Sequence, residues 1–151
     1  MGKRVYSYYC IDLLHSGHLL QMINGKRLAG EDGIHIIGVL TDEAIMEKKP
    51  RPVLPFKERM EIAKCIKYAD MVVPQATYSP LPNVLAMRPD ILMESASHSK
   101  ELIEESVKAM WSIGGKVIVT PYSPDESSTG IKERIKKNDK TVIGNSGAVV
   151  G

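Results

Sequence analysis

Cysteine and bulky aromatic residues are scarce in this sequence. Its 151 residues include two cysteines, one phenylalanine and one tryptophan. The cysteines, Cys10 and Cys65, form no CxxC pair, which argues against a disulfide scaffold and favours reduced thiols in the cytoplasm. No apolar run approaches the length of a membrane span, and the opening segment MGKRVYSYYC contains no apolar core of a signal peptide, so we predict no membrane insertion.

An excess of charge of either sign is also missing. Lys and Arg total 20, Asp and Glu total 18, and the formal net charge is +2. This balance argues against nucleic acid or a membrane surface as a bulk partner, so an anionic ligand must be held by a local site. A length of 151 residues with 43% apolar residues suffices for one domain with a real core.

Strand-like and helix-like segments alternate along the chain. Runs rich in β-branched and apolar residues predict strands at 5–11, 34–40, 71–74, 90–93 and 114–120. Apolar residues at helical spacing predict helices at 17–28, 56–68 and 100–112, short helices from 42 and over 81–89, and a last helix from about 127. The run IHIIGVL at 34–40 is apolar throughout, which is typical of a strand covered on both faces.

This alternation predicts the fold class. Five strand–helix repeats indicate an α/β fold: a Rossmann-like, doubly wound, mostly parallel five-stranded sheet with helices on both faces. Ligands of such sheets bind beyond the carboxyl ends of the strands, where the strand order reverses. We expect a catalytic domain over residues 1–138, whereas residues 139–151 show no clear structure and form a tail or linker.

Two of the four histidines lie in the segment IDLLHSGH, directly after the first predicted strand. If Gly17 opens a helix, the unpaired backbone N–H groups there point toward a bound anion, and His15 and His18 flank that helix end. Glycine lets a phosphate approach the backbone, and imidazoles donate hydrogen bonds to the oxygens of a transition state. The segment is therefore a candidate phosphate-transfer site.

Each histidine also has another interpretation. His15 and His18 could ligate zinc together with Asp12, although no HExxH pattern or distant cysteine pair supports a zinc site. His35 lies inside an apolar strand, which favours a packed histidine. His98 follows the fourth predicted strand, where it either fills a loop or contributes to an acceptor site.

Two further polar segments fit phosphate binding. The loop containing Lys48, Lys49 and Arg51 would ordinarily be a solvated loop, but its position after the second strand and its prolines favour phosphate contact. The hydroxyls at 127–129 open the last predicted helix, as a plain helix cap or as part of a polyphosphate cradle.

These landmarks resemble a known family in their order. HxGH at 15–18 resembles the signature of the nucleotidyltransferases that transfer a nucleoside monophosphate from a triphosphate. The TDE turn at 41–43, Lys48, the ER pair at 58–59, the strand YADMVVP at 68–74 and the SST segment at 127–129 are similar to the small cytidylyltransferases acting on glycerol 3-phosphate, phosphoethanolamine and phosphocholine, and to related phosphonate domains. The resemblance covers residues 5–136.

The resemblance implies roles for individual residues. His15 and His18 would stabilise the α-phosphate during transfer, and Lys48 would neutralise charge on the phosphates, which makes these three the catalytic residues. The residues assigned to nucleotide binding are Tyr9, Cys10, Ile11, Asp12, Gly17, Arg59, Ser127, Ser128 and Thr129. Those assigned to acceptor binding are Lys48, Glu94 and Tyr122. The triphosphate would carry Mg²⁺, and no dedicated protein metal site is expected.

Two segments depart from the family pattern. Residues 94–97 read Glu-Ser-Ala-Ser where the family has Gly-Asp-Asp-Trp, and residues 122–125 read Tyr-Ser-Pro-Asp where it has Arg-Thr-Glu-Gly. The resemblance predicts a homodimeric nucleotidyltransferase that moves CMP from CTP to a small phosphonate or phosphorylated alcohol. The alternatives are an adenylyltransferase that uses ATP, and a nucleotide-binding or regulatory domain without catalysis.

Overall fold

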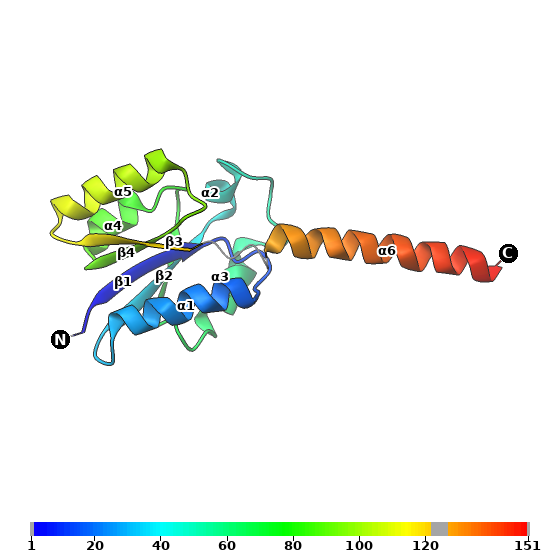
Figure 1. Ribbon diagram of the computed structural model, residues 1–151, viewed down its shortest axis with the longest axis horizontal. Coiled ribbons are helices and arrows are strands. Elements are labelled where there is room, and N and C mark those ends of the chain that lie inside the picture. The colour runs from blue at the N-terminus through cyan, green and yellow to red at the C-terminus, as the bar shows by residue number, and fades with distance from the viewer. Residues whose placement is uncertain (1, 122–126, 151) are drawn as a thin grey trace.

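The computed structural model describes residues 2–121 and 127–150, with side chains described up to Asp139. The strands are β1 (Arg4–Tyr9), β2 (Ile34–Leu40), β3 (Met71–Gln75), β4 (Ile91–Ser95) and β5 (Lys116–Thr120). The helices are α1 (Ser16–Ala29), α2 (Asp42–Met46), α3 (Phe56–Lys64), α4 (Leu81–Met87), α5 (Lys100–Ser112) and α6 (Ser128–Val150). Figure 1 shows the sheet between its helices, with α6 running away from it.

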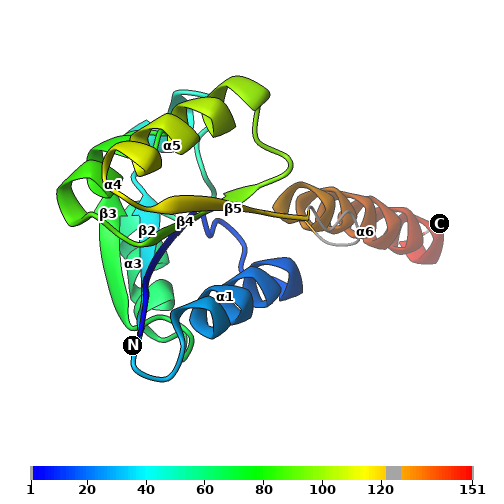
Figure 2. The same ribbon diagram turned by 60° about the vertical axis from the view of Figure 1, so that its left-hand side comes forward.

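The five strands form one parallel sheet in the order β3-β2-β1-β4-β5. The chain therefore winds outward from β1 to β3 and then returns to the other side of β1 for β4 and β5 (Figure 2). This confirms the predicted doubly wound α/β fold. The reversal lies between β1 and β4, so the loops that follow these two strands flank the crevice in which such sheets bind ligands.

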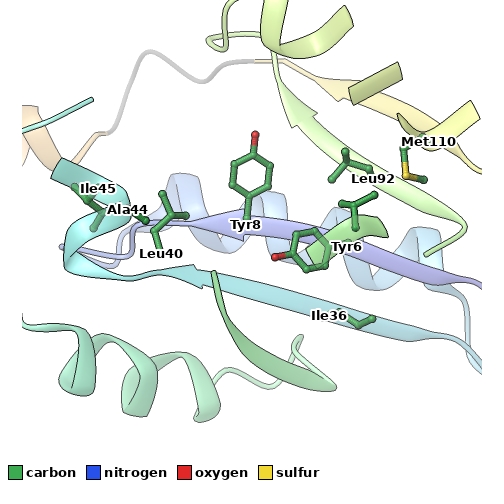
Figure 3. Packing of buried hydrophobic residues seen from close by; sticks show 9 residues of the cluster. Tyr6, Tyr8, Ile36, Leu40, Ala44, Ile45, Leu92 and Met110 are labelled. Atoms are coloured by element: carbon green, nitrogen blue, oxygen red, sulfur yellow. The ribbon is translucent and has the colours of Figure 1, made fainter. Parts of the chain in front are cut away.

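Helices cover both faces of the sheet, as predicted. On one face, Tyr6 and Tyr8 of β1 pack in a cluster with residues of α2, α4 and α5. Figure 3 shows Tyr8 standing up from β1 between Leu40 and Leu92. The opposite face packs against α1 and α3 through a second cluster that includes Ile37, Val39, Met22 and Ala63. All but the first residue of β2 are buried, which confirms the expectation from its continuous apolar run.

Several element ends differ from the predicted ones, and the backbone shows the reason for two of them, the ends of β1 and α3. β1 stops at Tyr9 rather than at residue 11, because its last pair with β2 joins Tyr9 to Val39 and the chain then turns through Ile11, whose φ is 52°. α3 stops at Lys64 rather than at residue 68. After Lys64, backbone hydrogen bonds that span three residues, from Cys65 N–H to the Ile62 carbonyl and from Ile66 N–H to the Ala63 carbonyl, replace the α-helical pattern.

The expectation of no clear structure at the end of the sequence was wrong, because α6 continues to Val150. The assignment of residues 139–151 to a tail or linker stays a prediction. The first half of α6 is rich in lysine, arginine, glutamate and isoleucine, which nucleate and propagate a helix. A glycine in a helix interior costs about 1 kcal/mol relative to alanine, which is too little to stop a helix that is already formed. The glycines of GNSGAVV therefore do not mark a boundary.

His35 is a packed core histidine, as expected. Its side chain is fully buried, its Nδ1–H donates to the Tyr68 carbonyl at 2.8 Å, and its Nε2 accepts from the Ser7 hydroxyl at 2.7 Å. This pattern uses the neutral imidazole, with one donating and one accepting nitrogen. Burial lowers the pKa of His35, and its hydrogen bond to Tyr68 and the nearby Asp70 offset only part of this.

The lowered pKa of His35 predicts that the protein loses stability in mild acid. Below the unfolded pKa of about 6.5, His35 binds a proton in the unfolded chain but stays neutral in the folded protein. The free energy of unfolding therefore decreases as the pH decreases below this value. One such group contributes a slope of up to about 1.4 kcal/mol per pH unit in that window. Urea unfolding at pH 7.5 and 5.5 measures it. His35→Gln should be less stable but show a shallower pH dependence, and an unchanged slope would contradict the assignment.

Candidate active site

The HSGH segment caps its own helix. His15 is the N-cap of α1; its Nδ1 accepts from the Gly17 N–H at 3.1 Å, while its own N–H donates to Nδ1 of His18 at 3.4 Å. This reciprocal pattern is a capping box in which histidines replace the usual Ser and Glu. The two imidazoles are therefore fixed by the helix start, with ring centroids 3.9 Å apart.

The capping pattern also fixes where each ring carries its proton. Because Nδ1 accepts a hydrogen bond in both rings, the neutral form of each carries its proton on Nε2. Burial, the neighbouring His15 and Lys49 lower the pKa of His18 to about 4. His18 is thus neutral at pH 7. A fixed neutral N–H suits a phosphate that gains charge during transfer, because it stabilises the transition state without holding a permanent charge.

The loop before the motif is tightly held. The ring of Tyr9 meets His18 edge-on, with centroids 5.9 Å apart, and Ile11 is fully buried in its left-handed conformation. Asp12 accepts from the Leu54 N–H at 2.9 Å and pairs with Lys132 of α6. Burial opposes ionisation of Asp12, but these hydrogen bonds outweigh burial and lower its pKa. Asp12 therefore joins three distant segments, and its contact with the nucleotide stays a prediction.

The start of α6 lies against the same loop. The Ser128 hydroxyl donates to the Leu13 carbonyl at 3.2 Å, and the Ser127 hydroxyl accepts from the Gly130 N–H at 3.0 Å. Thr129 is exposed. Because Leu13 precedes the N-cap of α1 by two residues, the N-termini of α1 and α6 come together, and both favour anions. The structure thus brings the two predicted phosphate-binding segments to one place (Figure 1).

Arg59 has a different position from the one expected. Its side chain is fully buried, and its guanidinium donates to the carbonyls of Cys10, Leu40 and Leu54 at 2.7, 2.6 and 3.0 Å. It also pairs with Asp42 at 2.7 Å. These bonds tie the ends of β1 and β2 to the loop before α3. The direct nucleotide contact predicted for Arg59 gains no support from this geometry, which gives the residue a positioning role.

The lysine loop acts on the site through Lys49, which the sequence grouped with Lys48 and Arg51 as a phosphate-contacting loop but did not assign to catalysis. Lys48 and Lys49 are both exposed. The charge of Lys49 reaches the site, because it lowers the pKa of His18 and also acts on the thiol of Cys10, whose pKa burial raises. The resemblance assigned the catalytic role to Lys48, whereas the charge that acts on His18 is that of Lys49. The role of Lys48 stays a prediction.

The residues assigned to the acceptor are not gathered on an open surface. Glu94 is 1% exposed, and its carboxylate accepts hydrogen bonds from Tyr8, Ser106 and His98 at 2.7, 2.7 and 2.5 Å. Tyr122 lies outside the described residues. No sequence pattern marked Tyr8 and Ser106 as partners of Glu94, because they come from a different strand and from a helix.

The described residues provide no set of side-chain ligands that could hold a metal ion. No group of three or more His, Cys, Asp and Glu side chains there is placed to hold one. Asp12, the third ligand of the zinc alternative, is committed to Lys132 and Leu54. A Mg²⁺ ion carried by triphosphate oxygens fits this site better, because it needs no carboxylate cage. None of the helices among residues 2–121 and 127–150 combines the length and apolarity that crossing a membrane requires.

The fold and site together define a class of protein. A doubly wound sheet with a histidine pair and two helix N-termini at its strand reversal suits the binding of a polyphosphate. A family profile described as "Cytidylyltransferase-like" matches residues 10–142. The chain belongs to this family, within the HxGH nucleotidyltransferases, and it is a nucleotidyltransferase.

Named relatives agree with the family. The chain is 32% identical over 143 residues to the bifunctional protein HldE of Alcanivorax borkumensis, covering 91% of the chain but only 29% of HldE. It is 32% identical over 141 residues to the FAD synthase of Korarchaeum cryptofilum, covering 91% and 94%. A lipopolysaccharide core biosynthesis protein from Thermoplasma volcanium has a similar fold, with a TM-score of 0.69 and 19% identity over 83% of this chain and 100% of that one.

A substitution of Arg59 tests whether its buried guanidinium stabilises the loops around the site. Arg59→Lys keeps the charge but loses the planar fork that reaches three carbonyls, so buried acceptors are left without donors. We expect the free energy of unfolding to fall by about 3 kcal/mol, as for other broken buried charge pairs. Urea unfolding measures the loss. Arg27→Lys on exposed α1 surface is the matched control and should change stability by less than about 0.5 kcal/mol; equal effects of the two substitutions would contradict the role of Arg59.

Proposed function

We propose that this chain transfers CMP from CTP to a small phosphonate or phosphorylated alcohol and releases pyrophosphate. The observation that carries the proposal is the pair His15 and His18, both with Nε2 protonated, fixed at the start of α1 beside the start of α6. The family profile supports cytidylyl transfer. ATP is the second candidate, because the family also contains a FAD synthase among the relatives of this chain.

The proposed reaction is an in-line displacement without a covalent enzyme intermediate. An oxygen of the acceptor's phosphate or phosphonate attacks the α-phosphate of the triphosphate, and the bond to pyrophosphate breaks on the opposite side. His15 and His18 donate to the oxygens that gain charge, and Lys49 with the predicted Lys48 adds positive charge nearby. Mg²⁺ held by the triphosphate supplies further charge neutralisation when bound.

Assembly and location complete the proposal. We propose a homodimer in which residues 66–74 lie at the interface, in the cytoplasm. β3 within this segment forms one edge of the sheet, and Met71 at its start is 42% exposed. Sedimentation of the protein at micromolar concentration would test the dimer, since a single species of 16.7 kDa would contradict it.

Removing one transition-state donor should leave folding intact and stop most turnover. His18→Ala should lower the rate of pyrophosphate release by roughly 100-fold or more, which is the cost of losing one such donor. A coupled pyrophosphate assay with circular dichroism as the folding check measures it. Leu20→Ala, at an exposed position of α1, serves as the control with near-normal turnover. A folded His18→Ala protein with normal turnover would remove His18 from the mechanism.

A matrix of triphosphates and acceptors tests the substrates. Pyrophosphate release should be fastest with CTP, combined with a small phosphonate or a phosphorylated alcohol such as glycerol 3-phosphate. An ATP rate more than about tenfold above the CTP rate, or about 1.4 kcal/mol of preference, would overturn the base assignment. If no pair of substrates gives pyrophosphate release but calorimetry shows that a triphosphate binds, the result would instead favour a nucleotide-binding domain without catalysis.

A further inference from the structure

A carboxylate lies beside the two helix starts that are proposed to bind the triphosphate. Asp12 precedes His15, the N-cap of α1, by three residues, and its side chain is 8% exposed. One of its oxygens accepts from the Leu54 N–H at 2.9 Å, and the other pairs with Lys132 of α6. Asp12 therefore lies where the loop after β1, the loop before α3 and the start of α6 meet.

This carboxylate is ionised at neutral pH. Burial alone would raise the pKa of Asp12, but the hydrogen bonds from Lys132 and from the Leu54 backbone lower it below the ordinary value. The site thus holds a permanent negative charge. A triphosphate is itself an anion, and like charges placed side by side weaken binding. Without compensation, Asp12 would repel the proposed ligand.

The structure gives Asp12 a task that explains why a carboxylate is present here. A half-buried backbone N–H needs an acceptor, and Asp12 provides one for Leu54. Arg59 binds the same residue from the other side of its peptide, through the Leu54 carbonyl at 3.0 Å. Side chains thus satisfy both polar groups of the Leu54 backbone and hold the loop before α3 against the end of β1.

Lys132 supplies the counter-charge from α6. Ser128 and Lys132 are one helical turn apart, so their side chains project from the same face of the helix. The Ser128 hydroxyl donates to the Leu13 carbonyl at 3.2 Å, and Lys132 pairs with Asp12. Successive turns of α6 therefore dock on neighbouring residues of the loop before α1, whereas residues 133–139 of α6 are exposed.

The two charges act in opposite directions on the neighbouring thiol of Cys10. Burial raises the pKa of this thiol; the charge of Asp12 raises it further, and the charge of Lys132 lowers it. The field of the pair thus reaches the loop after β1, and its two members offset each other there. Lys132 is the more accessible member, with 35% of its side chain exposed.

We propose that Lys132 enables the site to bind a polyphosphate by cancelling the charge of Asp12. This inference rests on the proposed function, which places the triphosphate at the starts of α1 and α6. Lys132 is a positioning residue and not a catalytic one, because it acts on the ligand through Asp12. The ligand class that depends on it is a polyphosphate anion, whichever base the nucleotide carries.

The proposal predicts unequal effects of neutralising the two partners. When Lys132 loses its charge, the carboxylate remains and repels the ligand; when Asp12 loses its charge, the ammonium remains and attracts it. A pair that only ties α6 to the loop would be weakened equally by either change. A lysine that contacted the phosphates directly would be missed even when Asp12 is neutral. Neutralising both partners therefore separates these three roles.

Calorimetric titration with inorganic tripolyphosphate measures the effect without a base or turnover. Lys132→Gln, which keeps an N–H donor for Asp12, should raise the Kd at least about tenfold, as expected for one uncompensated charge near the ligand. Asp12→Asn should bind at least as tightly as wild type, and the double variant should return to within about threefold of wild type. Lys136→Gln removes the same charge at an exposed position one turn further and should stay within about twofold.

The outcomes that would overturn the role of Lys132 are specific. A double variant as weak as Lys132→Gln would point to direct phosphate contact, and equal losses in Lys132→Gln and Asp12→Asn would point to a structural tie. Wild-type protein that binds no tripolyphosphate would also contradict the inference. Circular dichroism checks folding; if Lys132→Gln does not fold, weaker binding by Asp12→Asn than by wild type still contradicts the charge argument, and equal or tighter binding supports it.

Pyrophosphate release by the wild-type protein keeps the two proposals separable. Weakened tripolyphosphate binding in Lys132→Gln, without release from any substrate pair, would support the role of Lys132 and contradict the proposed function. Release by the wild-type protein, with unchanged tripolyphosphate binding in Lys132→Gln, would support the proposed function and contradict the role of Lys132. Neither release nor a change in binding would contradict both.

Discussion

The crevice depends on one buried guanidinium. Arg59 satisfies carbonyls at the ends of β1 and β2 and in the loop before α3, where the backbone leaves regular structure and would otherwise lack partners. Its pair with Asp42 offsets the cost of burying its charge. With the end of β1 held in this way, the chain can make the sharp turn through Ile11 and deliver His15 to the start of α1. The position of the histidine pair thus depends on a buried residue whose guanidinium bonds to the backbone and to Asp42.

The sequence predicted what is encoded locally. The apolar run of β2 predicted a buried strand correctly, because all but its first residue are buried. Apolar spacing also predicted the helix α5, although Val107 and Trp111 of that pattern are exposed. The helix start beside His15 and His18 is also local, and the motif predicted it, but the capping box that the two histidines form was not predicted. The continuation of α6 to Val150 was not predicted, because the segment GNSGAVV has no apolar helical spacing, whereas a helix that is already formed can extend through glycines.

What the sequence could not predict depends on contacts between distant segments. The partners of Arg59 lie 5, 17, 19 and 49 residues away, and those of Glu94 lie as far as 86 residues away. The family resemblance assigned Arg59 to the nucleotide and Glu94 to the acceptor, and neither assignment could take these distant partners into account. Only the fold shows that the first positions backbone and the second orients an imidazole. Likewise, the resemblance assigned the catalytic role to Lys48, whereas the charge that acts on His18 is that of Lys49.

The ion pair between Asp12 and Lys132 has a consequence for how the molecule forms. Its partners are 120 residues apart in the chain, whereas the other oxygen of Asp12 is bonded only 42 residues away. Contacts across long loops form late, because closing the loop costs chain entropy before the contact can compensate for it. During synthesis the sheet and its covering helices can fold before residue 132 exists. The nascent chain therefore passes through a stage in which the Rossmann-like body is complete but the polyphosphate cradle is still half open.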